Sequence, residues 1–344
     1  MLVFASSDHR QHHALEVDGG RLIPSWECPE RIDSIEAALV GPHAFRPPAP
    51  LDHALVASIH DAGYLEFLAS VWNRWVAAGE QGEAAMALCW PTRGMDQERV
   101  PTSVRGQLGF YSFAVDCSVT PGTWAAVCTS AALAQSAADA VVEGERVAFA
   151  LCRPPGHHAT SSQFGGYCYL NNAAVAAQRL LDHGRTRVAI VDVDYHHGNG
   201  TQDIFYRRDD VLYCSVHADP THHFPYYLGH ADERGDGEGV GFNHNEPMPL
   251  DTGFADWSAA LDRCLERVVA TGCEALVVSL GVDTFEGDPI SHFRLAGSDF
   301  VAMGRRLAAA ELPTVFVMEG GYAVGDLGRN VANVLDGFEA VTTG

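Results

Sequence analysis

The chain has 344 residues, of which 47% are hydrophobic and 19% charged, a composition typical of a globular protein with a sizeable core. Its formal net charge of -22 at pH 7 disfavours binding to nucleic acid or to an anionic membrane surface. The same charge would favour a cationic ligand, although an acidic surface can also serve solubility alone. No long apolar stretch is recognisable, and the nine cysteines are scattered without a C-x-x-C pair. We therefore expect a cytoplasmic protein with reduced thiols.

Residues 75–122 carry Gly, Pro, Trp and mixed charges, which predict a long surface loop with a role in binding or assembly. The remainder alternates apolar runs with helical segments. Helices are predicted over 123–144, 171–184, 257–272 and 300–312, and strands over 147–151, 188–194, 211–216, 275–283 and 313–321. Apolar runs without polar alternation indicate parallel strands buried on both faces, joined by helical crossovers. The sequence predicts one α/β domain over residues 1–344, built on an open parallel sheet.

Polar clusters follow three of these strands, and reactive groups in an open α/β sheet collect at the carboxyl ends of the strands. Asp192, Asp194 and His196 alternate, so they would share one face if the extended geometry persists. Asp194 and His196, joined by Asp283 from another strand, make a three-ligand site typical of catalytic zinc. Iron(II) or cobalt also fits this ligand set, and a lone D-x-H would more often cap a strand end.

The segment Arg153-Pro-Pro-Gly-His157-His158 follows the strand 147–151. Two consecutive histidines are not expected to be buried together in a core, and the rigid Pro-Pro-Gly loop would present them. Histidine has a suitable pKa to take a proton from water and return it to a leaving amine, whereas solvated loop histidines are the simpler interpretation. Asp192 would then be free to orient one of the two rings.

A second glycine-containing turn, Glu319-Gly-Gly-Tyr322, ends the last strand. The Gly-Gly pair allows a sharp turn that brings the phenol towards the metal, where it could donate a hydrogen bond to an oxyanion. A tyrosine after Gly-Gly is more often a loop-packing residue. No serine-hydrolase elbow, P-loop or dinucleotide fingerprint is present in the sequence. The other clustered histidines are interpreted as loop residues: His217, His222, His223 and His230.

Five motifs in order resemble those of the histone deacetylase-like amidohydrolases: RPPGHH, FGGYCYLNNAA, IVDVDYHHGNGTQDIFY, SLGVDTFEGDP and MEGGY. More narrowly, HDAGYLEFL, GTWAA and the long loop before it are similar to the bacterial acetylpolyamine amidohydrolases. The resemblance implies the arginase–deacetylase fold of the wider superfamily. That fold is a single central parallel sheet of about eight strands with helices on both faces.

The resemblance also implies roles for individual residues. It implies one zinc ion on Asp194, His196 and Asp283, His158 as the main proton carrier, His157 as its electrostatic partner, and Tyr322 as the group that polarises the substrate carbonyl. It further implies a structural potassium ion on Asp192, Asp194, the His196 carbonyl, Ser215 and the Val216 carbonyl. Asn199 stands where some family members have an aspartate, so His158 is expected to have less carboxylate support and a lower pKa.

The resemblance places Gly166 against the substrate through its backbone, with Tyr167 and Phe224 as aromatic walls for an aliphatic chain. Asp116 and Glu16 are expected to meet distant ammonium groups. Arg105 stands where a further acid is expected. A cation there would repel a polyamine unless it is paired or turned away.

We therefore predict zinc-dependent hydrolysis of the acetamide bond of small N-acetylated amines, with acetylpolyamines as the leading substrates. Another small amide, including a xenobiotic one, is the alternative that Arg105 favours, and a protein acetyl-lysine deacetylase would need an open rim. An arginase-like dimanganese enzyme would need further bridging aspartates. A metal-bound ligand sensor without catalysis conflicts with the complete set of His157, His158 and Tyr322. The long loop and the family favour a homodimer.

Overall fold

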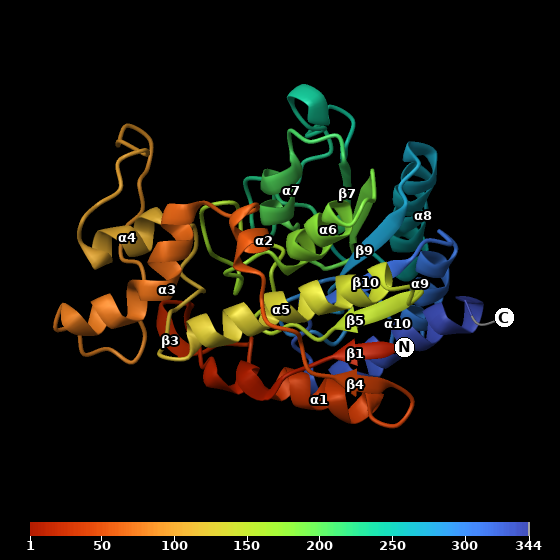
Figure 1. Ribbon diagram of the computed structural model, residues 1–344, viewed down its shortest axis with the longest axis horizontal. Helices are drawn as coiled ribbons and strands as arrows, with labels where there is room; N and C mark the ends of the chain where they lie inside the picture. Colours follow the sequence, from red (N-terminus) through yellow and green to blue (C-terminus); the bar gives the residue numbers. More distant parts are fainter. Residues whose placement is uncertain (343–344) are drawn as a thin grey trace.

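The computed structural model describes residues 1–342, whose main element is a sheet of eight parallel strands in the order β4-β1-β5-β10-β9-β6-β7-β8 (Figure 1). The predicted parallel sheet of about eight strands is confirmed. The strands are β1 (Leu2–Phe4), β4 (Ala44–Arg46), β5 (Val147–Ala150), β6 (Val188–Asp192), β7 (Val211–Ala218), β8 (Asn243–Met248), β9 (Ala275–Leu280) and β10 (Thr314–Met318). A separate antiparallel hairpin pairs β2 (Leu15–Asp18) with β3 (Arg21–Pro24).

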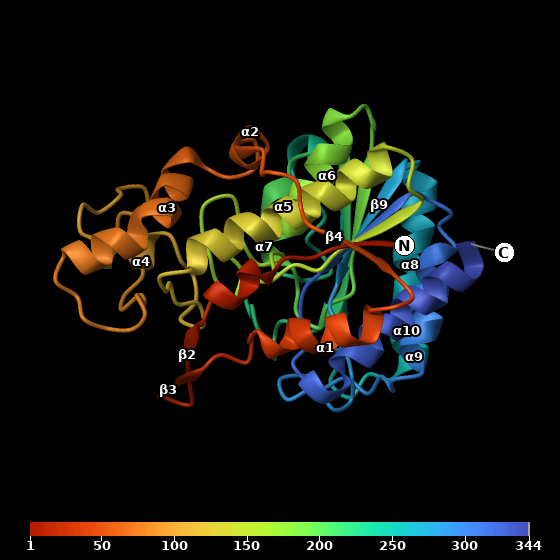
Figure 2. The ribbon, with the colours of Figure 1, turned by 60° about the horizontal axis from the view of Figure 1, so that its bottom comes forward.

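Helices cover both faces of the sheet. Helices α5 and α6 pack together on one face, and α1, α10, α9 and α8 pack side by side on the other (Figure 2). The helices are α1 (Glu30–Leu39), α2 (His53–Ala57), α3 (Ala62–Ala77), α4 (Val104–Phe110), α5 (Thr123–Val142), α6 (Asn172–Asp182), α7 (Asn199–Phe205), α8 (Phe254–Thr271), α9 (Asp299–Ala308) and α10 (Val324–Thr342), with two short 3-10 helices at Ser7–Gln11 and Gly237–Gly239.

The apolar runs form the core as their pattern predicts. Every residue of β5, β6, β7, β9 and β10 is buried, because helices cover both faces of these strands. The helix α5 carries many small residues and is mostly buried. By length and composition α5 would also be long and apolar enough to cross a membrane, although most of that stretch lies inside the protein.

Three strands of the sheet have no counterpart among the predicted elements. Strands β1 and β4 have only three residues each, and β8 has the polar sequence NHNEPM, so none gives a clear periodic signal. The expected loop 75–122 also contains the helix α4. Residues 78–103 have no helix or strand beyond a bridge of Ala85 with Val119, and they extend away from the sheet beside α3 and α4 (Figure 1, left).

The order of the strands gathers four loops at one edge of the sheet. Strands β5, β10, β9 and β6 are neighbours, and all run in the same direction. The segments that leave their carboxyl ends carry the two histidines, Tyr322, Asp283 and the D-x-H motif, respectively. Residues separated by up to 165 positions in the chain, from His157 to Tyr322, can therefore meet in one site.

Helices α9 and α10 approach each other closely at Gly304, where a Cβ atom would lie 1.9 Å from the Val334 carbonyl oxygen. We expect Gly304→Ala to lower the free energy of unfolding by roughly 1–3 kcal/mol, because the added methyl forces the helices apart. Gly325 of α10 has no atom within 4 Å of the corresponding position. Gly325→Ala is therefore the control and should be neutral or stabilising by up to about 1 kcal/mol. Equal urea unfolding midpoints for the two variants would contradict the close packing.

Candidate active site

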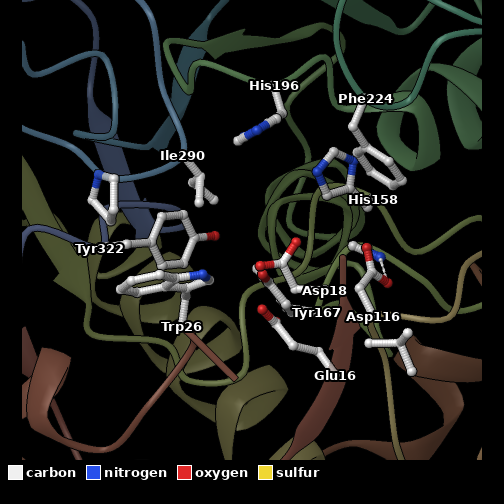
Figure 3. Close-up of a pocket in the computed structure, with 13 residues that line it drawn as sticks. Glu16, Asp18, Trp26, Asp116, His158, Tyr167, His196, Phe224, Ile290 and Tyr322 are labelled. Carbon is white, nitrogen blue, oxygen red and sulfur yellow. Dashed lines mark hydrogen bonds between the residues drawn. The ribbon is translucent and has the colours of Figure 1, made fainter. Parts of the chain in front are cut away.

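A cavity of about 370 Å³ opens at the carboxyl edge of the sheet. Figure 3 shows its side chains: His158, His196 and Tyr322 surround one part of the cavity, and Glu16, Asp18 and Asp116 bring carboxylates to another part. The cavity is lined by Glu16, Val17, Asp18, Trp26, Asp116, His158, Gly166, Tyr167, His196, Phe224, Pro289, Ile290 and Tyr322. Most of the residues predicted to bind substrate or carry out the reaction therefore face one space.

The structure brings the three predicted metal ligands together. Single donor atoms of Asp194, His196 and Asp283 all lie within 4.8 Å of one another. Nδ1 of His196 is 3.1 Å from a carboxylate oxygen of Asp283 and 3.3 Å from one of Asp194. Both carboxylates are fully buried, and the His196 side chain is 12% exposed. Two hard oxygen donors and one imidazole nitrogen at these separations can hold a divalent cation.

The three residues lie beyond the strands that lead to them. Strand β6 ends at Asp192, so Asp194 and His196 belong to the loop rather than to one continued strand face. Backbone N–H groups stabilise the carboxylates: that of Gly320 donates to Asp194 at 2.7 Å, and that of Tyr195 donates to Asp283 at 2.8 Å. The loops after β6 and β10 thus direct their N–H dipoles at the buried negative charges.

The charges in this cluster shift the pKa values of both carboxyl groups. Burial alone would raise the pKa of Asp194, but the nearby charges of His157 and His196 hold it below its ordinary value. Burial, together with the charge of Asp194, raises the pKa of Asp283 to about 7. A divalent cation would relieve the repulsion between these two carboxylates, as expected of a metal site.

The two histidines have different surroundings. Nδ1 of His157 lies 3.0 Å from Asp192, and Nδ1 of His158 lies 2.8 Å from the side-chain oxygen of Asn199. Burial opposes a charge on His157, yet Asp192 and Asp194 raise its pKa to about 10. Burial and the charges of neighbouring His157 and His196 lower the pKa of His158 well below its ordinary value. The surroundings therefore favour the charged form of His157 and the neutral form of His158.

Two expectations about histidines are corrected by these positions. His157 and His158 are both buried, with 3% and 4% exposure, because hydrogen bonds and the charge of Asp192 compensate for the loss of water. His217 lies inside strand β7 and is fully buried, rather than in the loop that follows it. The lower pKa expected for His158 is present, but its largest cause is burial rather than the replacement of an aspartate by Asn199.

Tyr322 faces the cavity from the turn after β10. Gly321 has φ of +130°, a conformation that a side chain would strain, so the Gly-Gly pair does provide the sharp turn. The carboxylate of Asp288 accepts hydrogen bonds from the backbone N–H groups of Tyr322 and Ala323 at 2.7 and 3.2 Å. The guanidinium of Arg31 donates to the Gly321 carbonyl at 2.7 Å and lies 4.9 Å from the centroid of the Tyr322 ring. The backbone of the tyrosine is therefore held on two sides.

Arg31 belongs to a buried ionic network that sequence analysis missed. Glu27 lies 2.9 Å from Arg31 and 2.8 Å from Arg153, and all three side chains are fully buried. The two guanidinium charges hold the pKa of Glu27 below its ordinary value against the effect of burial. The network links the loop of the histidines, through Arg153, to the loop of Tyr322. The only sequence signal for a member of this network was the RPPGHH motif, which contains Arg153.

The cavity is lined on opposite sides by aromatic rings and carries acids at its rim. The Phe224 ring packs edge-to-face on His158 at 4.9 Å, and Tyr167 packs against Tyr322 at 5.7 Å. Burial raises the pKa of Asp116 to about 6, although its carboxylate accepts the Gly166 N–H at 2.9 Å. Burial also raises the pKa of Glu16, which accepts a hydrogen bond from Ser25 at 3.0 Å. Asp18 and Trp26 are further rim residues that the sequence analysis did not single out.

Arg105 does not line the cavity. Its guanidinium pairs with Glu80, with N–O distances of 2.5 and 2.7 Å. The sequence suggested that Arg105 would repel a polyamine unless it was paired or turned away. In the described chain it is both paired with Glu80 and outside the cavity. Of the described residues that line the cavity, none is an arginine or a lysine.

The side chains assigned to a potassium site also lie together. Asp192 pairs with Ser215 in the register of β6 and β7, and its carboxylate accepts the Asp194 N–H at 3.2 Å. The Ser215 hydroxyl lies 2.8 Å from Nδ1 of His217. Val216 follows Ser215 in the fully buried strand β7.

Comparisons with known proteins agree with this geometry. Residues 25–338 match the histone deacetylase domain. The chain is 51% identical over 340 residues to an acetylpolyamine amidohydrolase of Mycoplana ramosa, covering 98% of this chain and 99% of that protein. It is 50% identical over 343 residues to acetylpolyamine amidohydrolase 1 of Pseudomonas aeruginosa, with 98% and 99% coverage. A crystal structure of an acetylpolyamine aminohydrolase from Burkholderia pseudomallei has a TM-score of 0.93 at 40% identity and covers 99% of both chains.

The chain therefore belongs to the histone deacetylase family, as its motifs predict. Within that family its full-length similarity is to acetylpolyamine amidohydrolases, so it is an enzyme of the amidohydrolase and deacetylase class.

Proposed function

We propose that this enzyme hydrolyses the acetamide bond of small N-acetylated amines, above all acetylpolyamines, and releases acetate and a free amine. The observation that carries the proposal is the cavity itself: aromatic walls lead from an acidic rim to a buried cluster of metal-ligand type. Its full-length relatives are named as acetylpolyamine amidohydrolases, which supports the same substrate class.

The donor set at the catalytic end suits a zinc ion held by Asp194, His196 and Asp283. Zinc bound there would supply Lewis acidity towards the amide carbonyl and the attacking water. We also assign a structural potassium ion to Asp192, Asp194, the His196 carbonyl, Ser215 and the Val216 carbonyl. The register of Asp192 with Ser215 supports this assignment.

The protein's own groups move the protons and stabilise the charge. Neutral His158 takes the proton from the attacking water and returns it to the leaving nitrogen, since its pKa is low and it faces the cavity. His157 remains cationic against Asp192 and stabilises the negative charge that develops beside it. The phenol of Tyr322 donates a hydrogen bond to the carbonyl oxygen as that oxygen becomes an anion.

The rest of the cavity would select the amine. Tyr167 and Phe224 offer flat apolar faces to a methylene chain, and the backbone of Gly166 lies beside them. Asp116 and Glu16 would receive an ammonium group further along the chain. Arg105 does not oppose this attraction, because its positive charge is paired with the carboxylate of Glu80.

A substrate panel tests the assignment. Zinc-loaded enzyme is assayed for acetate release from acetylpolyamines, acetyl-lysine peptides and neutral N-alkylacetamides. We expect acetylpolyamines to have the highest kcat/KM, because only they are both narrow and cationic at the far end. Higher kcat/KM for acetyl-lysine peptides would favour the protein deacetylase instead, and equal values for neutral amides would favour a general small-amide hydrolase.

The acidic rim predicts a pH dependence of selectivity. Asp116 has a raised pKa of about 6, so its charge is present above pH 6 and is lost as the pH falls through that value. The ratio of kcat/KM for a cationic acetylated amine to that for a neutral amide of equal length should therefore fall below pH 6. Asp116→Asn should give the low ratio at every pH while keeping the acceptor for Gly166. An unchanged ratio in this variant would remove Asp116 from substrate recognition.

Two variants separate metal binding from oxyanion stabilisation. Tyr322→Phe should retain one zinc per chain and lose roughly 10²–10³ in kcat, the usual effect of removing one preorganised donor. Asp283→Asn should lose both tightly bound zinc and activity, because it removes one of three ligands. Metal analysis after gel filtration, paired with acetate release, measures both effects. Full turnover by Tyr322→Phe would contradict the role of the phenol.

We further propose that the enzyme works as a cytoplasmic homodimer. Exposed apolar side chains in the protruding residues 78–103 support an assembly surface: Leu88, Met95 and Val100. All nine cysteines are free, as expected in a reducing compartment. Sedimentation equilibrium tests the assembly, and cell fractionation tests the compartment.

A further inference from the structure

Glu319 is a buried carboxylate whose role the mechanism leaves open. It follows β10 directly, is 0% exposed, and precedes the Gly-Gly turn that leads to Tyr322. One carboxylate oxygen accepts hydrogen bonds from the backbone N–H groups of Gly156 and His157, at 2.7 and 3.1 Å. The other accepts one from the Ser279 hydroxyl at 3.3 Å. A buried carboxylate is costly unless such donors surround it, so the donors and the acid depend on one another.

The contacts of Glu319 complete the attachment of the histidine loop. The carbonyl of Pro154 accepts hydrogen bonds from Ser130 and Asn172, at 2.7 and 3.1 Å, which fixes the beginning of the loop. The His157 carbonyl accepts the N–H groups of Gly200 and Thr201, at 3.0 and 3.1 Å. These bonds hold the loop by its carbonyl groups. Glu319 holds the same loop by its N–H groups.

The loop has little room to adopt another position. A Cβ atom at Gly156 would lie 2.3 Å from the backbone nitrogen of Asn172, so the chain already runs against α6 there. The ring centroids of His157 and His158 are 4.0 Å apart. The positions of both rings depend on the backbone that joins the two residues. A shift of the Gly156 and His157 amides would therefore move the proton-carrying ring relative to the cavity.

We propose that Glu319 is a positioning residue for the proposed hydrolysis: it fixes the histidine loop through the Gly156 and His157 amides and so sets the place of His158. It acts through the loop and does not touch the substrate. The proposal rests on the proposed function, since His158 is the base there. Misplacing a catalytic group by about 1 Å typically costs on the order of 10²-fold in rate.

Variants that separate length from charge test this role. Glu319→Asp keeps the charge but shortens the side chain by one methylene, so the carboxylate no longer reaches the loop. Glu319→Gln loses the charge but keeps an oxygen that can accept both amides, while its NH₂ can face the Ser279 hydroxyl. Glu319→Met keeps the approximate length and volume of the side chain but removes the oxygen that accepts the two amides. It replaces Glu319→Asp as the test variant if Glu319→Asp does not fold.

We expect Glu319→Asp and Glu319→Met to lose about 10²-fold in kcat with KM and zinc content unchanged, because the loop moves but the cavity remains. Glu319→Gln should recover most of the lost kcat. Hydrogen exchange of a peptide covering residues 153–158 should be faster in the first two variants and close to wild type in Glu319→Gln. This exchange measurement reports the two backbone hydrogen bonds without depending on turnover.

Asp52→Glu is the matched control. Asp52 also accepts two consecutive backbone N–H groups, from Ala54 and Leu55 at 2.9 and 3.4 Å, but it caps α2 away from the cavity. This change also alters the length of the side chain by one methylene and keeps its charge, although it lengthens rather than shortens it. It should leave kcat, KM and exchange of residues 153–158 unaltered.

Two results would overturn the positioning role: wild-type kcat in Glu319→Asp and Glu319→Met, or a Glu319→Gln variant as slow as Glu319→Asp, which would make charge the decisive property. Failure of the proposed function looks different, since wild-type enzyme would then release no acetate from any acetylated amine while the exchange differences remained.

Discussion

Several acids buried at one point of the sheet form the constraint on which the site depends. Asp192, Asp194 and Asp283 are all inaccessible to water and lie at the ends of neighbouring strands. Like charges in a medium of low dielectric repel strongly, so such a cluster persists only with cations and oriented donors beside it. The carboxylates favour the charged form of His157 beside them, and backbone N–H groups provide the donors. The remaining negative potential suits Asp194 and Asp283, together with His196, to a divalent ion. The same carboxylates raise the pKa of His157, whereas burial lowers that of His158.

The catalytic side chains are also held by segments far from them in the chain. Arg31 of α1 reaches under the turn that carries Tyr322, and Glu27 ties Arg31 to Arg153 at the start of the histidine loop. The loops after β5 and β10 are therefore fixed to one another through the first residues of the chain. Such cross-links keep loops in place although they leave the sheet, and preorganised groups need no rearrangement when charge develops.

Sequence patterns predicted those parts of the molecule that rest on local regularity. The buried strands β5, β6, β9 and β10 are apolar runs, and Asp194 with His196 follows one of them in a recognisable spacing. The strands β1 and β4 were missed because three residues carry no period. Asp18 and Trp26 were missed since nothing local marks a residue as part of a cavity rim. Burial of both loop histidines depends on partners such as Asp192 and Asn199, which only the folded chain brings within reach.

The hairpin of β2 and β3 stands apart from the eight-stranded sheet, yet it contributes Glu16, Val17 and Asp18 to the cavity. The proposed catalytic groups follow the strands of the sheet, whereas part of the proposed amine-binding surface comes from this hairpin. The hairpin shares few contacts with the elements of the sheet, so we expect substitutions in it to leave the packing of the sheet undisturbed. Such an arrangement would let changes in the hairpin alter the preference for an amine while the loops that carry the proposed catalytic groups stay the same.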